Sequence, residues 1–202
     1  DVYKRQVHYN MGGIPTNIHG EVLTLNDSGE SKIVKGLMSV GEAACVSVHG
    51  ANRLGSNSLL DLVVFGKSAA KRCAKILNPK KSNPKIEKSS YESIIKRFDE
   101  IKNSNGKYKI SDIRSEMQQI NQNYCPVYRS EEKMILGKEK LLNLLDKFKR
   151  IEIKDKTSVW NTEVIEALEL ENLLLQSLVS IESALNRKES RGAHAREDFP
   201  KR

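Results

Sequence analysis

Histidine, arginine and glutamate side chains gather among glycines in the first third of the sequence. His8 precedes the pair Gly12-Gly13, and Arg53 lies in the glycine- and asparagine-rich loop His49–Asn57. A guanidinium pairs with a carboxylate through two parallel hydrogen bonds, and an imidazole adds a further donor. Glycines allow the backbone to approach a flat or charged ligand closely. This combination predicts a site for a small carboxylate anion.

Short elements on both sides of this loop would position these side chains. The apolar run Leu37–Val40 favours a short buried strand whose end faces the site, and Glu42 follows it. Ser58 and Asp61 have the spacing of a capping box, with a helix predicted over Leu59–Lys75. The first half of this helix is apolar almost all round, so we expect it to be buried. Its first turn would present N–H groups and a positive dipole end to developing negative charge.

The same residues also allow simpler structural interpretations. A single histidine such as His8 is often structural, and an arginine such as Arg53 often braces its own loop. Glu42 could cap a helix, and Gly12-Gly13 could form only a turn. Residue types alone therefore leave a ligand site and a purely structural arrangement both open.

The composition changes near residue 78, which predicts two parts. Residues 7–77 hold most of the glycines and three of the four histidines, whereas residues 80–155 are rich in Lys and Glu. Residues 87–187 are expected to form a helical domain. Residues 78–86 are typical of a linker. In the first part we expect a strand at 21–25 and a turn at 26–29. The helices predicted for the second part cover residues 91–102, 111–123, 130–151 and 161–187.

Helical periodicity also predicts the inward faces of the last three helices. The inward-facing residues are Ile113, Met117 and Ile120, then Met134, Leu136, Leu141, Leu144, Leu145 and Phe148, and finally Ile165, Leu168, Leu175, Leu178 and Leu185. Such a bundle carries no chemistry by itself.

Length and composition exclude several classes of protein. The 202 residues are 38% hydrophobic and 30% charged, which is typical of a globular protein and not of a disordered tail. No apolar run reaches the roughly 18 residues of a membrane span. The net charge of +8 would allow nucleic-acid binding, but lysines mixed with glutamates and only 5% aromatic residues argue against it. Three scattered cysteines favour neither a disulfide framework nor a metal site.

Four strings of the sequence resemble one known family. They are His8–Thr16, Gly41–Gly66, Trp160–Thr162 and Glu189–Pro200, and the resemblance covers residues 7–202 in order. The family is that of the flavoprotein subunit of succinate dehydrogenase. The resemblance implies an α+β fold, namely the C-terminal remainder of a Rossmann-like FAD-binding domain followed by a mainly helical bundle. Residues 188–202 would begin a C-terminal domain.

The resemblance also implies an enzyme and a site. In this family succinate is oxidised to fumarate by hydride transfer to FAD, and electrons pass through an iron–sulfur subunit to a quinone at membrane-anchor subunits. His8 and Arg53 correspond to residues that bind the dicarboxylate. Glu42 corresponds to the residue at the FAD ribose, and Ser58 and Leu59 to those at the pyrimidine edge of the flavin. Placement would be peripheral, on the cytoplasmic face of a bacterial inner membrane or the matrix face of a mitochondrial one.

Several family features fall outside this sequence. There is no GxGxxG motif, and the family's covalent FAD histidine and proton-transfer arginine also belong upstream of His8. We therefore expect an internal fragment, inactive alone, whose α-helix at residues 59–75 leaves apolar surface exposed. Residues 1–6 do not match the family and are interpreted as a non-native leader.

Alternatives remain at this stage. A fumarate reductase flavoprotein would use nearly the same site in reverse, and an L-aspartate oxidase-like enzyme shares part of the loop. A non-catalytic helical interaction module would need no site at all. His49 is expected to order its loop or to act on the substrate through its neighbours, and a direct contact with substrate stays open. Arg191, His194 and Arg196 are given no role beyond contacts between domains or subunits.

Overall fold

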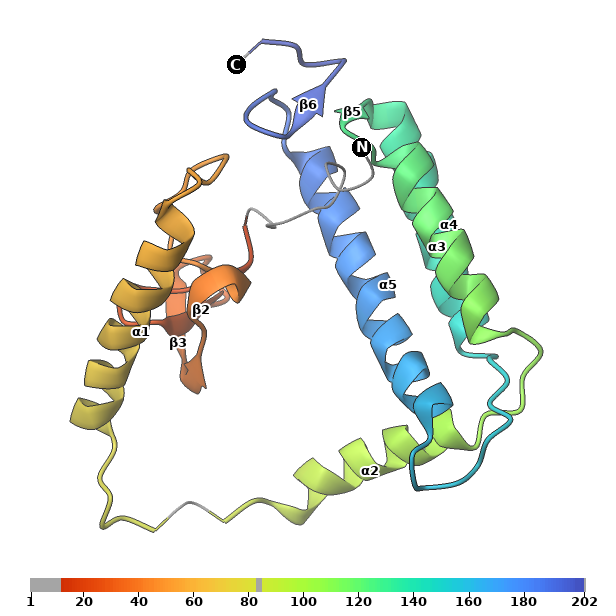
Figure 1. Ribbon diagram of the computed structural model, residues 1–202, viewed down its shortest axis with the longest axis horizontal. Helices are drawn as coiled ribbons and strands as arrows, with labels where there is room; N and C mark the ends of the chain where they lie inside the picture. Colours follow the sequence, from red (N-terminus) through yellow and green to blue (C-terminus); the bar gives the residue numbers. More distant parts are fainter. Residues whose placement is uncertain (1–11, 83–84, 202) are drawn as a thin grey trace. The chain divides into compact units, whose positions relative to one another are not determined.

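The computed structural model describes residues 12–82 and 85–201 (Figure 1). Its chain forms two compact units, residues 1–83 and 84–202, and each is described by itself. The first unit combines short strands with one long helix, and the second is mainly helical. The mixed α and β character therefore agrees with the expected fold class.

A β-hairpin supplies the two longest strands of the first unit. Strand β2, Glu21–Leu25, pairs antiparallel with β3, Ser31–Met38. In the turn between them, the side-chain oxygen of Asn26 accepts the backbone N–H groups of Ser28 and Glu30, at 3.1 and 2.8 Å. Asparagine favours such turns because its side chain replaces a backbone acceptor. The predicted strand at 21–25 and the turn at 26–29 are confirmed.

The apolar run Leu37–Val40 does not form a separate buried strand, so that prediction is wrong. Its first two residues end β3, and Leu37 is 52% exposed. The physical reason is that β3 pairs with β2 in a two-stranded sheet, which leaves side chains open that a larger covered sheet would bury. A 3₁₀ turn, Gly41–Ala43, follows the run and carries Glu42.

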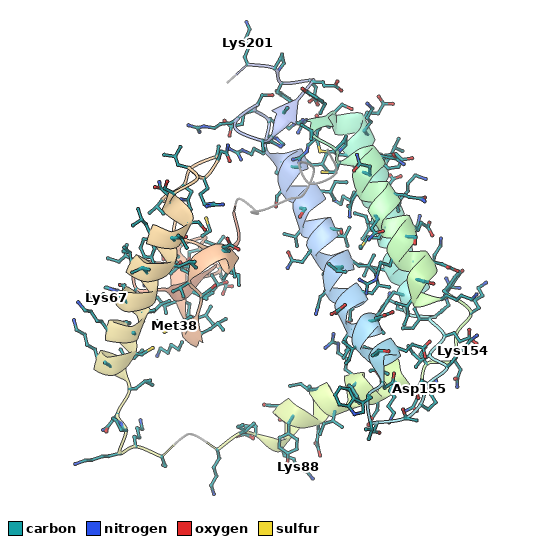
Figure 2. All side chains as sticks on the ribbon, in the orientation of Figure 1. Met38, Lys67, Lys88, Lys154, Asp155 and Lys201 are labelled. Atoms are coloured by element: carbon teal, nitrogen blue, oxygen red, sulfur yellow. The ribbon has the colours of Figure 1, made fainter. Side chains whose placement is uncertain are left out.

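Helix α1, Asn57–Ile76, packs against the 3₁₀ turn Gly41–Ala43, and two of its side chains contact the hairpin. The Nε of Arg72 donates to Oε1 of Glu21 at 2.9 Å, which joins the helix to the start of β2. Further along, Sγ of Cys73 lies 3.2 Å from Sδ of Met38, whose side chain is at the end of β3 (Figure 2). A short parallel pair, β1 at Ile14–Pro15 and β4 at Ala44–Cys45, completes the unit.

The apolar first half of α1 is exposed, so the prediction that it would be buried is wrong for this chain. The side chain of Leu59 is 72% exposed, and the buried residues of the helix are Asp61 and Ala69. A helix that is apolar on all sides needs neighbours on all sides, and the described part of the first unit covers one. The exposed apolar residues are Leu59, Leu60, Leu62, Val63 and Val64. They form the open apolar surface that the sequence led us to expect.

Three helices build the core of the second unit. The helices of this unit are α2 (Lys88–Lys102), α3 (Ile110–Tyr124), α4 (Glu131–Phe148) and α5 (Thr162–Asn186). Fully buried side chains of α3, α4 and α5 interlock, among them Ile113, Met134 and Leu174. The Asn161 side chain accepts the N–H of Val164 at 3.0 Å and so caps α5. All four predicted helices are confirmed.

The inward face of α5 differs from the predicted one. Ile165 and Leu175 are about half exposed, while the neighbouring positions Val164 and Leu174 are buried. Leu168, Leu178 and Leu185 are partly buried against the core. Helix α5 carries apolar residues on more than one face, so periodicity alone allows two adjacent stripes. In α4 the predicted residue Leu136 is likewise exposed, and the other five pack inward.

Arg196 connects the end of α5 with the start of α4. Its Nε and Nη2 donate to the two carboxylate oxygens of Asp198 at 2.7 and 2.6 Å, and its Nη1 donates to the carbonyls of Ala184 and Leu185. Asp198 in turn accepts the N–H of Glu131 at 2.9 Å. The hydrogen bonds from Arg196 hold the pKa of Asp198 well below its usual range. The Arg196 side chain is therefore a buried internal clasp.

His194 occupies the same region with both ring nitrogens engaged. Its Nδ1 lies 2.9 Å from Nη1 of Arg129, and its Nε2 lies 2.9 Å from the carbonyl of Arg187. Because arginine can only donate, Nδ1 accepts and Nε2 carries the proton. Burial lowers the pKa of His194, and the charge of Arg129 acts in the same direction. The backbone of Arg191 also bonds that of His194, so all three residues left without a role make contacts within this unit.

Candidate functional site

The 3₁₀ turn brings Glu42 against the first turn of α1. The Ser58 hydroxyl donates to Oε1 of Glu42 at 3.3 Å, although the two residues are 16 positions apart. Glu42 is exposed, so its carboxylate retains room to accept hydrogen bonds from a ligand. The two residues that were assigned to the ribose and to the flavin edge are thus brought together.

The start of α1 is open to a ligand. The helix begins at Asn57 after Ser56, and among the described residues no side chain caps its first turn. The capping box predicted from Ser58 and Asp61 is therefore wrong, because Ser58 lies inside the helix and its hydroxyl turns to Glu42. The first N–H groups of a helix have no partner within the helix, and they carry its positive dipole end. An electron-rich edge of a ligand suits this position.

Arg53 lies in the loop that joins β4 to α1. Its Nη1 donates to the carbonyl of Gly55 at 3.2 Å, and the side chain is half-buried. The guanidinium carries five N–H donors in a planar fork that matches the geometry of a carboxylate. The loop turns at Ser47 and Gly50, which have φ angles of 65° and 60°. Glycine adopts such angles without strain, whereas serine seldom does.

His49 and Asp61 form a buried polar contact at the base of this loop. Nε2 of His49 lies 3.0 Å from Oδ2 of Asp61, with side chains 11% and 6% exposed. The expectation that His49 orders its loop agrees with this geometry. Asp61 was missed as its partner because the capping-box spacing gave that residue another role. The available signal was an acidic residue within an apolar helical run.

The structure places four of the five predicted site residues. Ser58 and Leu59 lie in the first turn of α1, and Glu42 lies in the 3₁₀ turn, with its side chain in contact with Ser58. Arg53 lies in the loop that leads into α1. His8 lies outside the described residues, so its role stays a prediction. The assignment of residues 1–6 as a leader also lies outside them. Within residues 12–82 and 85–201 no group of three or more His, Cys, Asp or Glu side chains could hold a metal ion.

Two family models match the chain. One, described as FAD binding domain, matches residues 2–59, and the other, described as Fumarate reductase flavoprotein C-term, matches residues 114–202. The first match contains the loop and the start of α1. The second contains α4, α5 and the Arg196 clasp.

Individual proteins agree with these matches. The chain is 53% identical over 196 residues to the succinate dehydrogenase flavoprotein subunit of Rickettsia bellii, which covers 97% of this chain and 33% of that protein. It is 48% identical to the mitochondrial succinate dehydrogenase [ubiquinone] flavoprotein subunit of Oryza sativa, over 97% of this chain and 31% of that protein. Quinol fumarate reductase of E. coli superposes with a TM-score of 0.82 at 38% identity, covering 98% of this chain and 32% of that one.

The fold and these matches define the class first: the chain is similar to flavoprotein subunits, and its residues 2–59 match an FAD binding domain. The chain belongs to the family of succinate dehydrogenase and fumarate reductase flavoprotein subunits. It spans about a third of the length of the curated relatives it matches. No helix in the described part of the chain is long and apolar enough to cross a membrane.

Proposed function

We propose that this chain supplies the substrate-binding arginine and part of the flavin contact of an enzyme that oxidises succinate to fumarate. The observation that carries the proposal is the Ser58–Glu42 hydrogen bond of 3.3 Å, which joins the two cofactor assignments at the start of α1. FAD supplies the chemistry when bound, because it accepts the hydride that leaves succinate. The residues of this chain would bind and orient succinate and would stabilise the negative charge that develops on the flavin.

The residues at the start of α1 fit the flavin. The N–H groups near Ser58 and Leu59 point out of an uncapped helix end, where they would stabilise negative charge on the pyrimidine edge. The exposed carboxylate of Glu42 would accept hydrogen bonds from the ribose hydroxyls. The exposed Leu59 side chain offers an apolar surface to a planar ring.

Arg53 and His8 would hold the dicarboxylate. A guanidinium binds a carboxylate through two parallel bonds, so it fixes the plane of that group as well as its place. A succinate held in this way can present one C–H bond toward the flavin. His8 would donate a further hydrogen bond to the same carboxylate.

Partners and placement follow from the same proposal. Electrons would leave the flavoprotein for an iron–sulfur subunit and then pass to a quinone at membrane-anchor subunits. The flavoprotein would sit peripherally on the cytoplasmic face of a bacterial inner membrane, or on the matrix face of a mitochondrial one.

The test uses a flavoprotein subunit that is as long as the curated relatives and that includes the sequence of this chain. Arg53→Lys keeps the charge and loses the bidentate geometry, so we expect kcat/KM for succinate to fall by at least tenfold, or about 1.4 kcal/mol. The control Arg150→Lys changes an exposed arginine of the second unit and should leave turnover unchanged. Turnover by Arg53→Lys within twofold of the unmodified enzyme would refute the assignment.

Fumarate reduction is the second candidate, favoured by the superposition on quinol fumarate reductase. One transition state serves both directions, so the site residues are the same. The ratio of succinate oxidation to fumarate reduction, measured on the assembled enzyme with dyes of high and low potential, distinguishes the two directions.

A further inference from the structure

We propose that Asp61 and His49 form a positioning pair that fixes the loop carrying Arg53 in its substrate-binding arrangement. The inference rests on the proposed function of Arg53 and names how that residue is held. Neither side chain of the pair is assigned to contact substrate. Both act through the loop.

The His49–Asp61 contact links the loop to helix α1. Nε2 of His49 and Oδ2 of Asp61 are 3.0 Å apart, across 12 positions of the chain. The side chains are 11% and 6% exposed, so the contact is shielded from water. A shielded contact between an imidazole and a carboxylate is directional, and breaking it leaves a polar group buried without its partner.

The burial of Asp61 is opposite to that of its neighbours on α1. Leu59 and Val63, two positions to either side, are 72% and 68% exposed, whereas Asp61 is buried. Asp61 is also the one acidic residue of the helix. An aspartate is seldom buried unless it is paired. The contact with the loop therefore explains why this polar residue turns inward.

The pair sits where it can restrict Arg53. The loop between His49 and α1 contains Gly50 and Gly55, and Arg53 stands between them. Glycines leave such a loop many conformations. The contact of His49 with Asp61 on α1 closes the chain between these two residues into a short loop, which reduces the number of conformations that it can adopt. The guanidinium then spends more of its time where a carboxylate can bind it.

This mechanism predicts which kinetic constant changes. Apparent affinity falls in proportion to the fraction of molecules in the binding arrangement. If loosening the loop reduces that fraction to about a tenth, KM for succinate rises about tenfold. Bound substrate reorders the loop, so kcat should stay within about threefold. A pair that only stabilised the fold would lower flavin content and thermal stability without this split.

The experiment compares four variants in a flavoprotein of family length that contains this segment. Asp61→Ala removes the acceptor, and its KM should rise about tenfold. Asp61→Asn keeps an oxygen that can accept from Nε2, so its KM should rise no more than about threefold. The controls His19→Phe and Asp27→Asn change exposed residues of the same unit and should change neither constant.

A double variant, His49→Phe with Asp61→Leu, separates positioning from simple burial. Replacing both partners of a buried hydrogen bond by apolar groups can leave stability nearly unchanged. We expect this variant to keep its flavin and still show a KM raised at least fivefold. A stable double variant with the KM of the unmodified enzyme would overturn the inference, as would an Asp61→Ala enzyme with KM within twofold. If Asp61→Ala loses its flavin, the double variant alone decides.

The unmodified enzyme separates this inference from the proposed function. If it neither oxidises succinate nor binds a dicarboxylate inhibitor, the proposed function fails and the inference fails with it. If it is active and the variants keep its KM, only the inference fails.

Discussion

Substitution of Arg196 by lysine tests whether the clasp at the C-terminal string holds the ends of α4 and α5 together. Lysine keeps the charge but loses the planar fork that bonds both oxygens of Asp198 and the carbonyls of Ala184 and Leu185. The substitution removes several charge-assisted bonds from a side chain that is 1% exposed. The Asp198 side chain is partly exposed to solvent. Water can therefore hydrate its carboxylate when the arginine is lost, which lowers the free-energy cost of the substitution.

The expected cost follows from the bonds that are lost. A hydrogen bond to a charged group contributes about 1.5–3 kcal/mol, and two such bonds join Arg196 to Asp198. After allowance for the exposed part of Asp198 and for the charge that lysine keeps, we expect a loss of about 2–4 kcal/mol. Since about 1.4 kcal/mol is a factor of ten, local opening should become roughly 30- to 1,000-fold more frequent.

Native-state hydrogen exchange measures this opening. The amides at the end of α5 and the N–H of Glu131, which bonds Asp198, should exchange faster by that factor. Amides in the middle of α3 should change little. Arg191→Lys, an exposed arginine of the same string, is the matched control. Exchange in Arg196→Lys that equals the control at both helix ends would refute the clasp.

Three further predictions concern the second unit. First, burial lowers the pKa of His194, so the contribution of His194 to the free energy of unfolding is constant above the ordinary histidine pKa near 6.5 and decreases as the pH falls from there toward the folded-state pKa. A pH titration of stability checks this, and a His194→Gln variant with the same slope between pH 7 and pH 5 would contradict it. Second, Asn161→Ala removes the cap of α5 and the hydrogen bonds from the Asn161 side chain to the carbonyls of Asp155 and Thr157. The free energy of unfolding, measured by chemical denaturation, should fall by about 1–2 kcal/mol. An unchanged midpoint would show that the cap contributes nothing. Third, a Cβ at Gly106 would lie 1.9 Å from the carbonyl oxygen of Arg150, so Gly106→Ala should displace this backbone and lower the melting temperature by several degrees; a melting temperature equal to that of the unmodified protein would exclude the close approach.

The elements of the second unit could be predicted because each helix carries a local signal. Ile113, Met117 and Ile120 lie at helical spacing with polar residues between them, and all three are buried. Helix α5 shows the limit of this reasoning. Its apolar residues form adjacent stripes, and only the positions of α3 and α4 decide that Leu174 faces the core and Leu175 does not. Helical periodicity alone does not decide which apolar stripe of α5 faces the core, and the contacts with the neighbouring helices do.

The candidate site was predictable in its residue types and less so in its contacts. Glu42 and Ser58 could be assigned to one cofactor through the family strings, and they lie within hydrogen-bond distance. The contact between His49 and Asp61 could not be foreseen, since it depends on how the loop folds back onto α1. The apolar composition of α1 indicated that the helix needs neighbours on several sides, but it could not show which part of a protein supplies them, and in this chain the apolar residues are exposed.

The most direct test of the central claim is an experimental structure of a family-length flavoprotein with this segment, loaded with FAD and a dicarboxylate inhibitor such as malonate. We expect Arg53 and His8 to bond the same carboxylate group, and the first-turn amides of α1 near Ser58 and Leu59 to face the pyrimidine edge of the flavin. Density that places the Arg53 and His8 side chains on opposite sides of the fold, with no shared cavity between them, would contradict it.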